Sequence, residues 1–162
     1  MDPATRRFIL EIVSSRSDLT LATIRPDGYP QANIVSYASE GLAIYFGTGR
    51  DSRKLANIRY CNKISLAIET PYSDWSAIKA LSMAGIAEEL TPGSAECRHA
   101  VDLLIERYPA VREMPALDDL STMAFVRITP EIISVLDYAK GFGHTELVRV
   151  GSDDVRAERP FC

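Results

Sequence analysis

Two short turns near the start of the sequence leave little freedom in how the chain can fold. The apolar run from Leu19 to Ile24 is followed by Pro26-Asp27-Gly28, and the next run extends from Tyr29 to Tyr37. Ser39-Glu40-Gly41 then separates this run from a third, Leu42 to Phe46. Turns of this length hold the residues that hairpins prefer and leave no room for the helix that a parallel crossover needs. The sequence therefore predicts an antiparallel meander of three strands.

Hydrophobic periodicity predicts the remaining elements. Further strands are expected at Lys63 to Thr70, Ala77 to Leu90 with an interruption at Gly85, Met123 to Ile128 and Ile132 to Asp137. Packing helices are expected around Phe8 to Val13, after Ser52 and within Thr91 to Tyr108, and irregular structure over Pro109 to Leu120. Six or seven mostly antiparallel strands with flanking helices predict a mainly β, α+β fold whose sheet is closed or nearly closed. No repeat or linker marks a boundary, so residues 1–162 are predicted to form one domain.

Charge and cysteine content argue against several classes of protein. The chain has 18 Lys and Arg against 22 Asp and Glu, a net charge of -4, and no basic stripe, so nucleic-acid binding is not expected. No apolar run approaches the roughly 20 residues of a membrane-spanning helix, and no signal-peptide layout is present, so a cytoplasmic protein without membrane attachment is expected.

Cys61, Cys97 and Cys162 are odd in number and widely spaced, which disfavours a disulfide framework. Cys97 falls on the apolar face of a predicted helix, so no metal site is expected.

Positive charge gathers at the start of the second predicted helix, where it is electrostatically unfavourable. Arg53 and Lys54 occupy the first turn, with Ser52 as the candidate N-cap and Thr48 just before it. A helix N-terminus already carries about half a positive charge, so each cation there is destabilising unless an anion is bound. Backbone N–H groups, two hydroxyls and two cations together predict a small-anion site, with phosphate as the usual ligand. The alternative is a solvated basic turn that Asp51 partly offsets.

Several segments, in order, resemble a known family of flavoproteins. They are Leu21-Ala22-Thr23-Ile24, Pro26-Asp27-Gly28-Tyr29-Pro30, Ile44-Tyr45-Phe46-Gly47-Thr48, Ser52-Arg53-Lys54, Lys63-Ile64-Ser65-Leu66 and Gly85-Ile86-Ala87-Glu88-Glu89-Leu90. From about Phe8 to Leu90 this order resembles the pyridoxamine 5'-phosphate oxidase-like, FMN-binding split-barrel proteins. The resemblance implies a split β-barrel that forms a homodimer, with two FMN molecules in clefts between the protomers.

The resemblance also implies which residues bind the cofactor. They are Asn33, Ile34, Val35, Ser36, Thr48, Ser52, Arg53, Lys54 and Lys79. The first four correspond to a strand that supplies backbone contacts alongside the isoalloxazine ring, and the next four to the hydroxyls and cations that hold the phosphate. Lys79 corresponds to a polar residue that reaches the cofactor, including across the dimer interface. The alternative for Lys79 is an ordinary exposed strand lysine.

The activity that the resemblance implies is hydride transfer between a small substrate or a nicotinamide and bound FMN, with the substrate left open. Leu147 to Cys162 does not match the C-terminal segment of the pyridoxamine phosphate oxidases, which contains arginine and histidine, so vitamin B6 oxidation is not expected. Tyr138 to Thr145 resembles the branch that includes general stress proteins. The alternatives are a noncatalytic stress protein that binds flavin, or haem through His144, and a reductase that holds the deazaflavin F420 in the same phosphate site.

Two segments that contain aromatic residues hold the remaining candidate functional residues. Within Tyr138 to Thr145, Phe142 is a candidate to cover the flavin, and Lys140 or His144 a candidate to stabilise charge near its ring. The alternative is a turn with a surface histidine. Trp75, the single tryptophan, is expected to pack in the core, with a dimer or pocket wall as the alternative.

Overall fold

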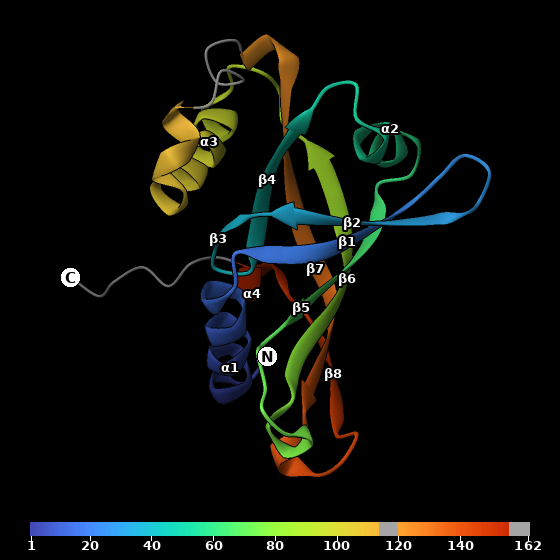
Figure 1. Cartoon of the computed structure of the whole chain (residues 1–162), viewed down its shortest axis with the longest axis vertical. Coiled ribbons are helices and arrows are strands. Elements are labelled where there is room, and N and C mark those ends of the chain that lie inside the picture. Colours follow the sequence, from blue (N-terminus) through green and yellow to red (C-terminus); the bar gives the residue numbers. More distant parts are fainter. Residues whose placement is uncertain (114–119, 156–162) are drawn as a thin grey trace.

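Eight strands form one antiparallel sheet that curls into a half-barrel, with helices packed around it (Figure 1). A computed structural model of the chain describes residues 1–113 and 120–155. The strands are β1 (Asp18–Ile24), β2 (Pro30–Ser36), β3 (Ala38–Glu40), β4 (Ala43–Gly49), β5 (Lys63–Glu69), β6 (Lys79–Glu89), β7 (Met123–Asp137) and β8 (Thr145–Arg149). The helices are α1 (Pro3–Ser15), α2 (Arg53–Tyr60), α3 (Ala95–Arg107) and α4 (Ser152–Val155), and short 3-10 helices include η1 (Trp75–Ala77), η2 (Pro109–Glu113), η4 (Leu120–Thr122) and η5 (Tyr138–Lys140). The predicted fold class is confirmed, with one strand more than expected.

The order of the strands differs from the expected meander. The strands lie in the order β2-β1-β5-β6-β7-β4-β3, and β8 pairs with the second half of β7. The β1–β2 hairpin is as predicted, and Gly28 takes a φ of 85° in its turn. The third predicted strand, observed as β4, pairs with β3 and β7 and not with β2, so the meander was wrong. The alternation of apolar and polar residues along a strand shows which of its faces is buried. It does not show which other strand pairs with it.

The long strand β7 replaces two shorter predicted strands. It runs without interruption through Pro130, where its register with β6 shifts at Ala84 and Gly85. A Cβ atom on Gly85 would lie 2.5 Å from the backbone oxygen of Thr129, so only glycine fits this close approach. The bulge bends the two strands together and lets the sheet curl. The additional strand β8, only five residues long, was not predicted.

The main core fills the inside of the half-barrel, and α1 covers it with Ile9, Ile12 and Val13. A second apolar cluster lies between α3 and the opposite face of β4 and β7, and it includes Cys97, as the helical spacing predicted. Each large apolar side chain buried in these clusters stabilises the fold by about 1.5–3 kcal/mol. No helix in the described part of the chain is both long and apolar enough to cross a membrane.

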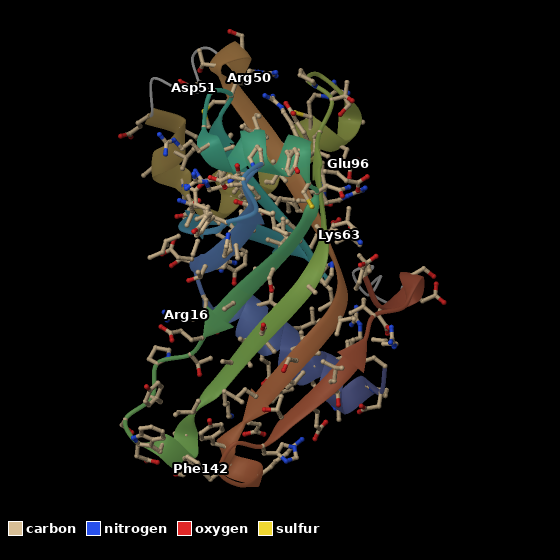
Figure 2. All side chains as sticks on the ribbon, turned by 90° about the vertical axis from the view of Figure 1, so that its right-hand side faces the viewer. Arg16, Arg50, Asp51, Lys63, Glu96 and Phe142 are labelled. Atoms are coloured by element: carbon tan, nitrogen blue, oxygen red, sulfur yellow. The ribbon has the colours of Figure 1, made fainter. Side chains whose placement is uncertain are left out.

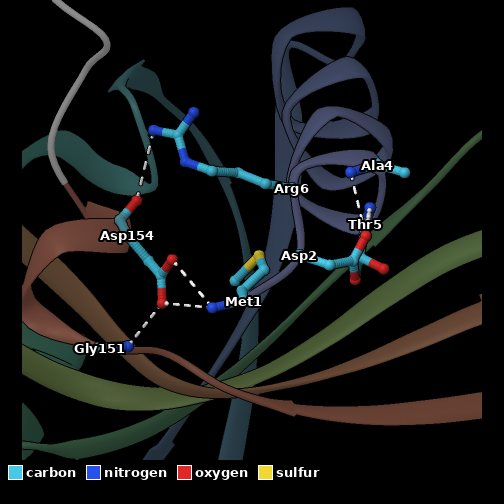
Figure 3. Close-up of polar contacts among 7 residues, drawn as sticks. All are labelled: Met1, Asp2, Ala4, Thr5, Arg6, Gly151 and Asp154. Atoms are coloured by element: carbon cyan, nitrogen blue, oxygen red, sulfur yellow. Dashed lines mark hydrogen bonds and ion pairs between the residues drawn. The ribbon is translucent and has the colours of Figure 1, made fainter.

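The start of α1 is held against the end of the chain that the structure describes (Figure 3). Asp2 caps the helix by accepting hydrogen bonds from the backbone N–H groups of Ala4 and Thr5, both at 3.0 Å. The Met1 amino group lies 3.3 Å from Asp154 Oδ1, and Arg6 donates to the Asp154 carbonyl oxygen at 3.4 Å. These contacts fix α1 next to α4 over the inside of the half-barrel.

Candidate functional site

Three of the residues predicted to bind phosphate lie together at the N-terminus of α2. Thr48 Oγ1 donates to Ser52 Oγ at 3.0 Å, and Lys54 Nζ donates to Thr48 Oγ1 at 3.2 Å. Ser52 is the N-cap, as predicted, and accepts a hydrogen bond from the Leu55 N–H at 3.4 Å. The backbone N–H groups of Arg53 and Lys54 precede the first hydrogen bonds within the helix. Hydroxyl, ammonium and N–H donors therefore gather in one place, which is the donor set that a phosphate needs.

The ion pairs around this end of α2 leave two cations unpaired. Glu89 of β6 pairs with Arg59 at 2.7 Å and lies 3.8 Å from Arg50. The hydrogen bond from Arg59 lowers the pKa of Glu89 below its ordinary value, and the charges of Arg59 and Arg50 act in the same direction, while burial opposes them. Within residues 1–113 and 120–155, neither Arg53 nor Lys54 has a carboxylate partner, so Asp51 does not offset them by an ion pair. An anion bound here would meet two positive charges that the protein has not neutralised.

The four residues predicted to contact the flavin ring lie on β2, an outermost strand of the sheet. Its side chains alternate: Asn33 and Val35 point inward, and Ile34 and Ser36 point outward, with Ile34 77% exposed. Because β2 pairs only with β1, its outer edge offers backbone N–H and C=O groups that no neighbouring strand uses. Asn33 Oδ1 is buried and has no hydrogen-bond partner in the part of the chain that the structure describes. Such an edge is able to make the backbone contacts that the resemblance implies for this strand.

A buried amide joins the two parts of the candidate site. Asn57 of α2 is 4% exposed and donates to Thr23 Oγ1 of β1 and to Gln31 Oε1 of β2, both at 3.0 Å. One side chain thus ties the helix that carries Lys54 to both strands of the β1–β2 hairpin. The sequence analysis missed Asn57, although it lies between Leu55 and Ile58 of the predicted apolar stripe, and that position was the available signal.

Lys79 lies at the opposite end of the molecule. It begins β6, whereas Glu89 at the end of β6 contacts α2. The ten residue steps from Lys79 to Glu89 span roughly 33 Å at about 3.3 Å per step, well beyond the reach of one flavin. Lys79 Nζ lies 5.3 Å from the centre of the Phe8 ring and lines a cleft of about 590 Å³ beside α1. Within this chain, therefore, Lys79 is not brought to the other candidate residues.

The second candidate loop also lies at this far end. Lys140 and His144 both contact Glu146 Oε1 at 2.9 Å, and the hydrogen bonds from His144 and Lys140 lower the pKa of Glu146. Trp75 is 66% exposed and stacks on Phe142 with ring centres 6.0 Å apart. The expectation that Trp75 packs in the core was wrong, because the turn between β5 and β6 carries it beyond the last covered residues of the sheet.

A match to a family model shows to which family the chain belongs. The family model for pyridoxamine 5'-phosphate oxidase matches residues 5–137, most of the chain, including the cluster at α2 and the hairpin of β1 and β2. The chain belongs to the pyridoxamine 5'-phosphate oxidase family. The resemblance predicted from the sequence is therefore confirmed. No protein of curated function matches the sequence.

Solved structures share the fold of this family member. A haem-binding protein from Mycobacterium smegmatis has a TM-score of 0.77 at 22% identity, covering 92% of this chain and 59% of that longer chain. The conserved hypothetical protein Rv2991 from Mycobacterium tuberculosis has a TM-score of 0.71 at 26% identity, covering 94% of each chain. General stress protein 26 from Bacillus anthracis has a TM-score of 0.65 at 17% identity, covering 90% of this chain and 98% of that chain. These likenesses establish the split-barrel fold.

The two cysteines that the structure describes lie in no cluster that could hold a metal ion. Cys61 and Cys97 are free thiols, and Cys162 lies outside the described residues. In residues 1–113 and 120–155 no group of three or more His, Cys, Asp or Glu side chains is placed to hold a metal ion. The cluster at α2 thus remains the best-supported site for a ligand.

Proposed function

We propose that this chain is an FMN-binding flavoprotein that acts as an oxidoreductase on a small substrate or a nicotinamide. The observation that carries the proposal is the cluster of Thr48, Ser52 and Lys54, with Arg53 beside it and no carboxylate of the described residues paired with the two cations. A phosphate group would accept hydrogen bonds from this cluster and replace an unfavourable charge arrangement by a favourable one.

Each part of the chain has a definite task in this proposal. Lys54 and Arg53 bind the phosphate, and Ser52, whose hydroxyl oxygen already accepts two hydrogen bonds, donates its proton to it. The free edge of β2 orients the ring, and Asn33 Oδ1 provides a buried acceptor for a ring N–H group. When bound, FMN supplies the site that accepts or donates the hydride, so the chain needs to bind, orient and shield.

The first experiment is to purify the protein, record its visible spectrum and weigh the cofactor that denaturation releases. A flavin spectrum with the mass of FMN is expected, and added FMN should raise the melting temperature of the apoprotein. The F420 alternative predicts a different mass from the same site. A colourless protein whose melting temperature does not rise with added FMN would refute the proposal.

Lys54→Met tests the phosphate assignment. Loss of one charge-assisted hydrogen bond should weaken FMN binding about 10- to 100-fold, while riboflavin, which lacks the phosphate, should bind almost as before. Arg59→Ala is the matched control, because it removes a cation from the same helix that is already paired with Glu89. Equal losses for FMN and riboflavin with Lys54→Met would contradict the assignment.

Haem binding is a second candidate, because the similar protein from Mycobacterium smegmatis is described as haem-binding. In this chain the candidate ligand is His144, which Glu146 orients through a 2.9 Å hydrogen bond. Titration with haemin, followed by its intense near-ultraviolet band, separates the two proposals. A band that grows stoichiometrically with added haemin, and that is lost in His144→Ala but not in His99→Ala, would favour haem binding.

A further inference from the structure

A cavity of about 280 Å³ lies between α3 and the sheet. Side chains of α3 line one side of it, and residues of β2, β4 and β7 line the other. Figure 2 shows α2 and α3 at the same end of the molecule, the end that carries Arg50 and Asp51, with Phe142 at the other end. Figure 1 shows β4 running between the two helices. The cavity therefore lies at the end of the molecule that holds the candidate phosphate cluster.

Two lining residues connect the cavity to the candidate flavin site. Ser36 is the last residue of β2, whose free edge would orient the flavin ring. Gly47 lies in β4 directly before Thr48 of the phosphate cluster. Because successive residues of a strand point to opposite faces, the cavity and the phosphate cluster lie on the two sides of β4.

The edge of β4 leaves a passage between these two sides. On one edge, β4 pairs with β7 as far as Gly49. On the other edge it pairs with β3 only as far as Tyr45, and no strand of the described chain pairs with Phe46 to Gly49 there. A ligand that is held by its phosphate at α2 can pass this open edge and reach the mouth of the cavity beside Ser36.

The walls of the cavity are uncharged. None of the described residues that line it is ionised at neutral pH, and its sides are formed by aliphatic and aromatic groups such as Val101, Ile105 and Phe125. Tyr108 presents its ring, because its hydroxyl group is directed at the backbone carbonyl oxygen of Tyr37, 2.8 Å away. A charged group would lose its hydration here without gaining a partner.

Ser36 provides a polar group at the mouth. Its Oγ donates a hydrogen bond to Asp18 Oδ1 at 2.5 Å, so the oxygen remains able to accept one. The mouth thus suits a ligand that carries a single hydroxyl or amine N–H group at one end. A phosphorylated molecule is disfavoured at this position, because Asp18 adds a negative charge beside it.

The floor of the cavity owes its depth to a glycine. A Cβ atom on Gly47 would lie 3.2 Å from Phe125 Cε1 and 3.5 Å from Met123 Cε, so any larger residue would take up this space. An apolar cavity of about 150 Å³ accepts benzene in a well-studied protein. The larger volume here leaves room for a second fused ring.

We propose that this cavity binds an uncharged, apolar molecule of about two fused rings, and that it is the substrate pocket of the flavin site. The polar end of the molecule lies at Ser36, beside the edge of β2, and its rings lie between α3 and β7. The assignment as a substrate pocket rests on the function proposed above, whereas the binding of such a molecule does not.

The first test compares two naphthalene probes by calorimetric titration at pH 7. One site per chain is expected for 2-naphthol, which is uncharged, and binding about tenfold or more weaker for 2-naphthoate, which brings a carboxylate to the same ring system. Val101→Phe fills the cavity and should weaken 2-naphthol binding about tenfold. Leu103→Phe is the matched control, because it enlarges a side chain of the same helix that lines a different cavity. No saturable binding of 2-naphthol, or equal binding by wild type and Val101→Phe, would overturn the proposal.

A second variant keeps the test valid if Val101→Phe does not fold. Ile105→Lys is partly exposed and should place a cation at the cavity, so that 2-naphthoate binds more tightly than 2-naphthol. Glu106→Lys adds positive charge one residue away, outside the cavity, and should keep the preference of the wild type. A folded Ile105→Lys variant that still prefers 2-naphthol would contradict the assignment of the site.

Titration of the FMN-loaded protein with 2-naphthol separates the substrate assignment from the proposed function. Binding should quench flavin emission and shift the flavin absorption bands, with saturation at the concentrations that calorimetry gives. Saturation of the cavity with an unchanged flavin spectrum would overturn its role as the substrate pocket. A protein that binds 2-naphthol but not FMN would refute the proposed function and, with it, the substrate assignment, while the cavity would stand as a binding site.

Discussion

Single residues in this protein show how a buried group can shape the response to pH. Tyr37 is completely buried, and its hydroxyl donates to the carbonyl oxygen of Val13 at 2.6 Å. Burial raises the pKa of Tyr37 to about 12, although the nearby positive charge of Arg107 acts in the opposite direction. The folded protein therefore keeps this proton at pH values where an unfolded chain has lost it.

Tyr37→Phe should change the alkaline limb of the stability curve. Between pH 10 and 12 the unfolded state of the wild type ionises and the folded state does not, so the free energy of unfolding falls by about 1.4 kcal/mol per pH unit. The variant loses the hydrogen bond to Val13, worth about 1 kcal/mol, but lacks this slope. Urea unfolding at pH 9, 10 and 11 measures both effects, with Tyr29→Phe at an exposed position as the control. Parallel curves for wild type and Tyr37→Phe above pH 10 would contradict the assignment.

At the scale of elements, α2 is short and depends on the hairpin beside it for its position. Eight residues form a marginal helix in isolation, so tertiary contacts must hold it. Leu55 and Ile58 anchor it in the core, and Asn57 fixes its direction relative to β1 and β2 through two hydrogen bonds. The spacing between the phosphate cluster and the free edge of β2 is thus set by this one amide.

Asn57→Leu should lower the free energy of unfolding and, as a separate effect, the affinity for FMN. Thr23 Oγ1 and Gln31 Oε1 both lose the amide donor, at a cost of about 1–3 kcal/mol in the free energy of unfolding. FMN affinity should fall several-fold because α2 no longer holds the cations in register with β2, although Arg53 and Lys54 are unchanged. Calorimetric titration well below the melting temperature measures the affinity, and Asn62→Leu at an exposed position is the control. Unchanged FMN affinity in a folded variant would show that Asn57 is structural only.

The sequence predicted local features well because their causes are local. The Ser52 cap, the Pro26-Asp27-Gly28 turn and the alternation of Lys63 to Thr70 each depend on a few neighbouring residues, and each is observed. The phosphate cluster also lies within seven consecutive residues, so it could be recognised before the fold was known. The position of each strand within the sheet could not be predicted in this way. Strand order depends on which buried faces fit together, and Trp75 could be placed only once the hairpin that carries it was known to extend beyond the sheet.

At the scale of the whole molecule, a net charge of -4 hides an uneven distribution. Glu89 pairs with Arg59 and lies near Arg50, whereas Arg53 and Lys54 of the candidate phosphate cluster have no carboxylate partner among the described residues, in a protein that is acidic overall. Among the described residues, Lys63 and Glu69 have no ion-pair partner, and they lie at the two ends of the exposed side of β5. Composition alone would suggest that this protein repels anions, yet positive charge is concentrated at the start of α2, and Lys63 and Glu69 place opposite charges at the two ends of β5.

A charge swap tests that arrangement directly. In the homodimer that the resemblance implies, packing of two exposed β5 faces about a two-fold axis across the strands would place each Lys63 against the partner's Glu69, and this contact would occur twice. Lys63→Glu or Glu69→Lys alone therefore creates two repulsive contacts and should raise the dissociation constant of the dimer about tenfold or more at low salt. The double variant Lys63→Glu with Glu69→Lys restores both attractive contacts and should return the constant close to that of the wild type. Analytical ultracentrifugation over a dilution series measures the three constants, and added salt should compress the differences because exposed charges are screened. If the double variant dissociates as readily as the single ones, the two residues do not face each other, and the copies must associate by another surface or not at all.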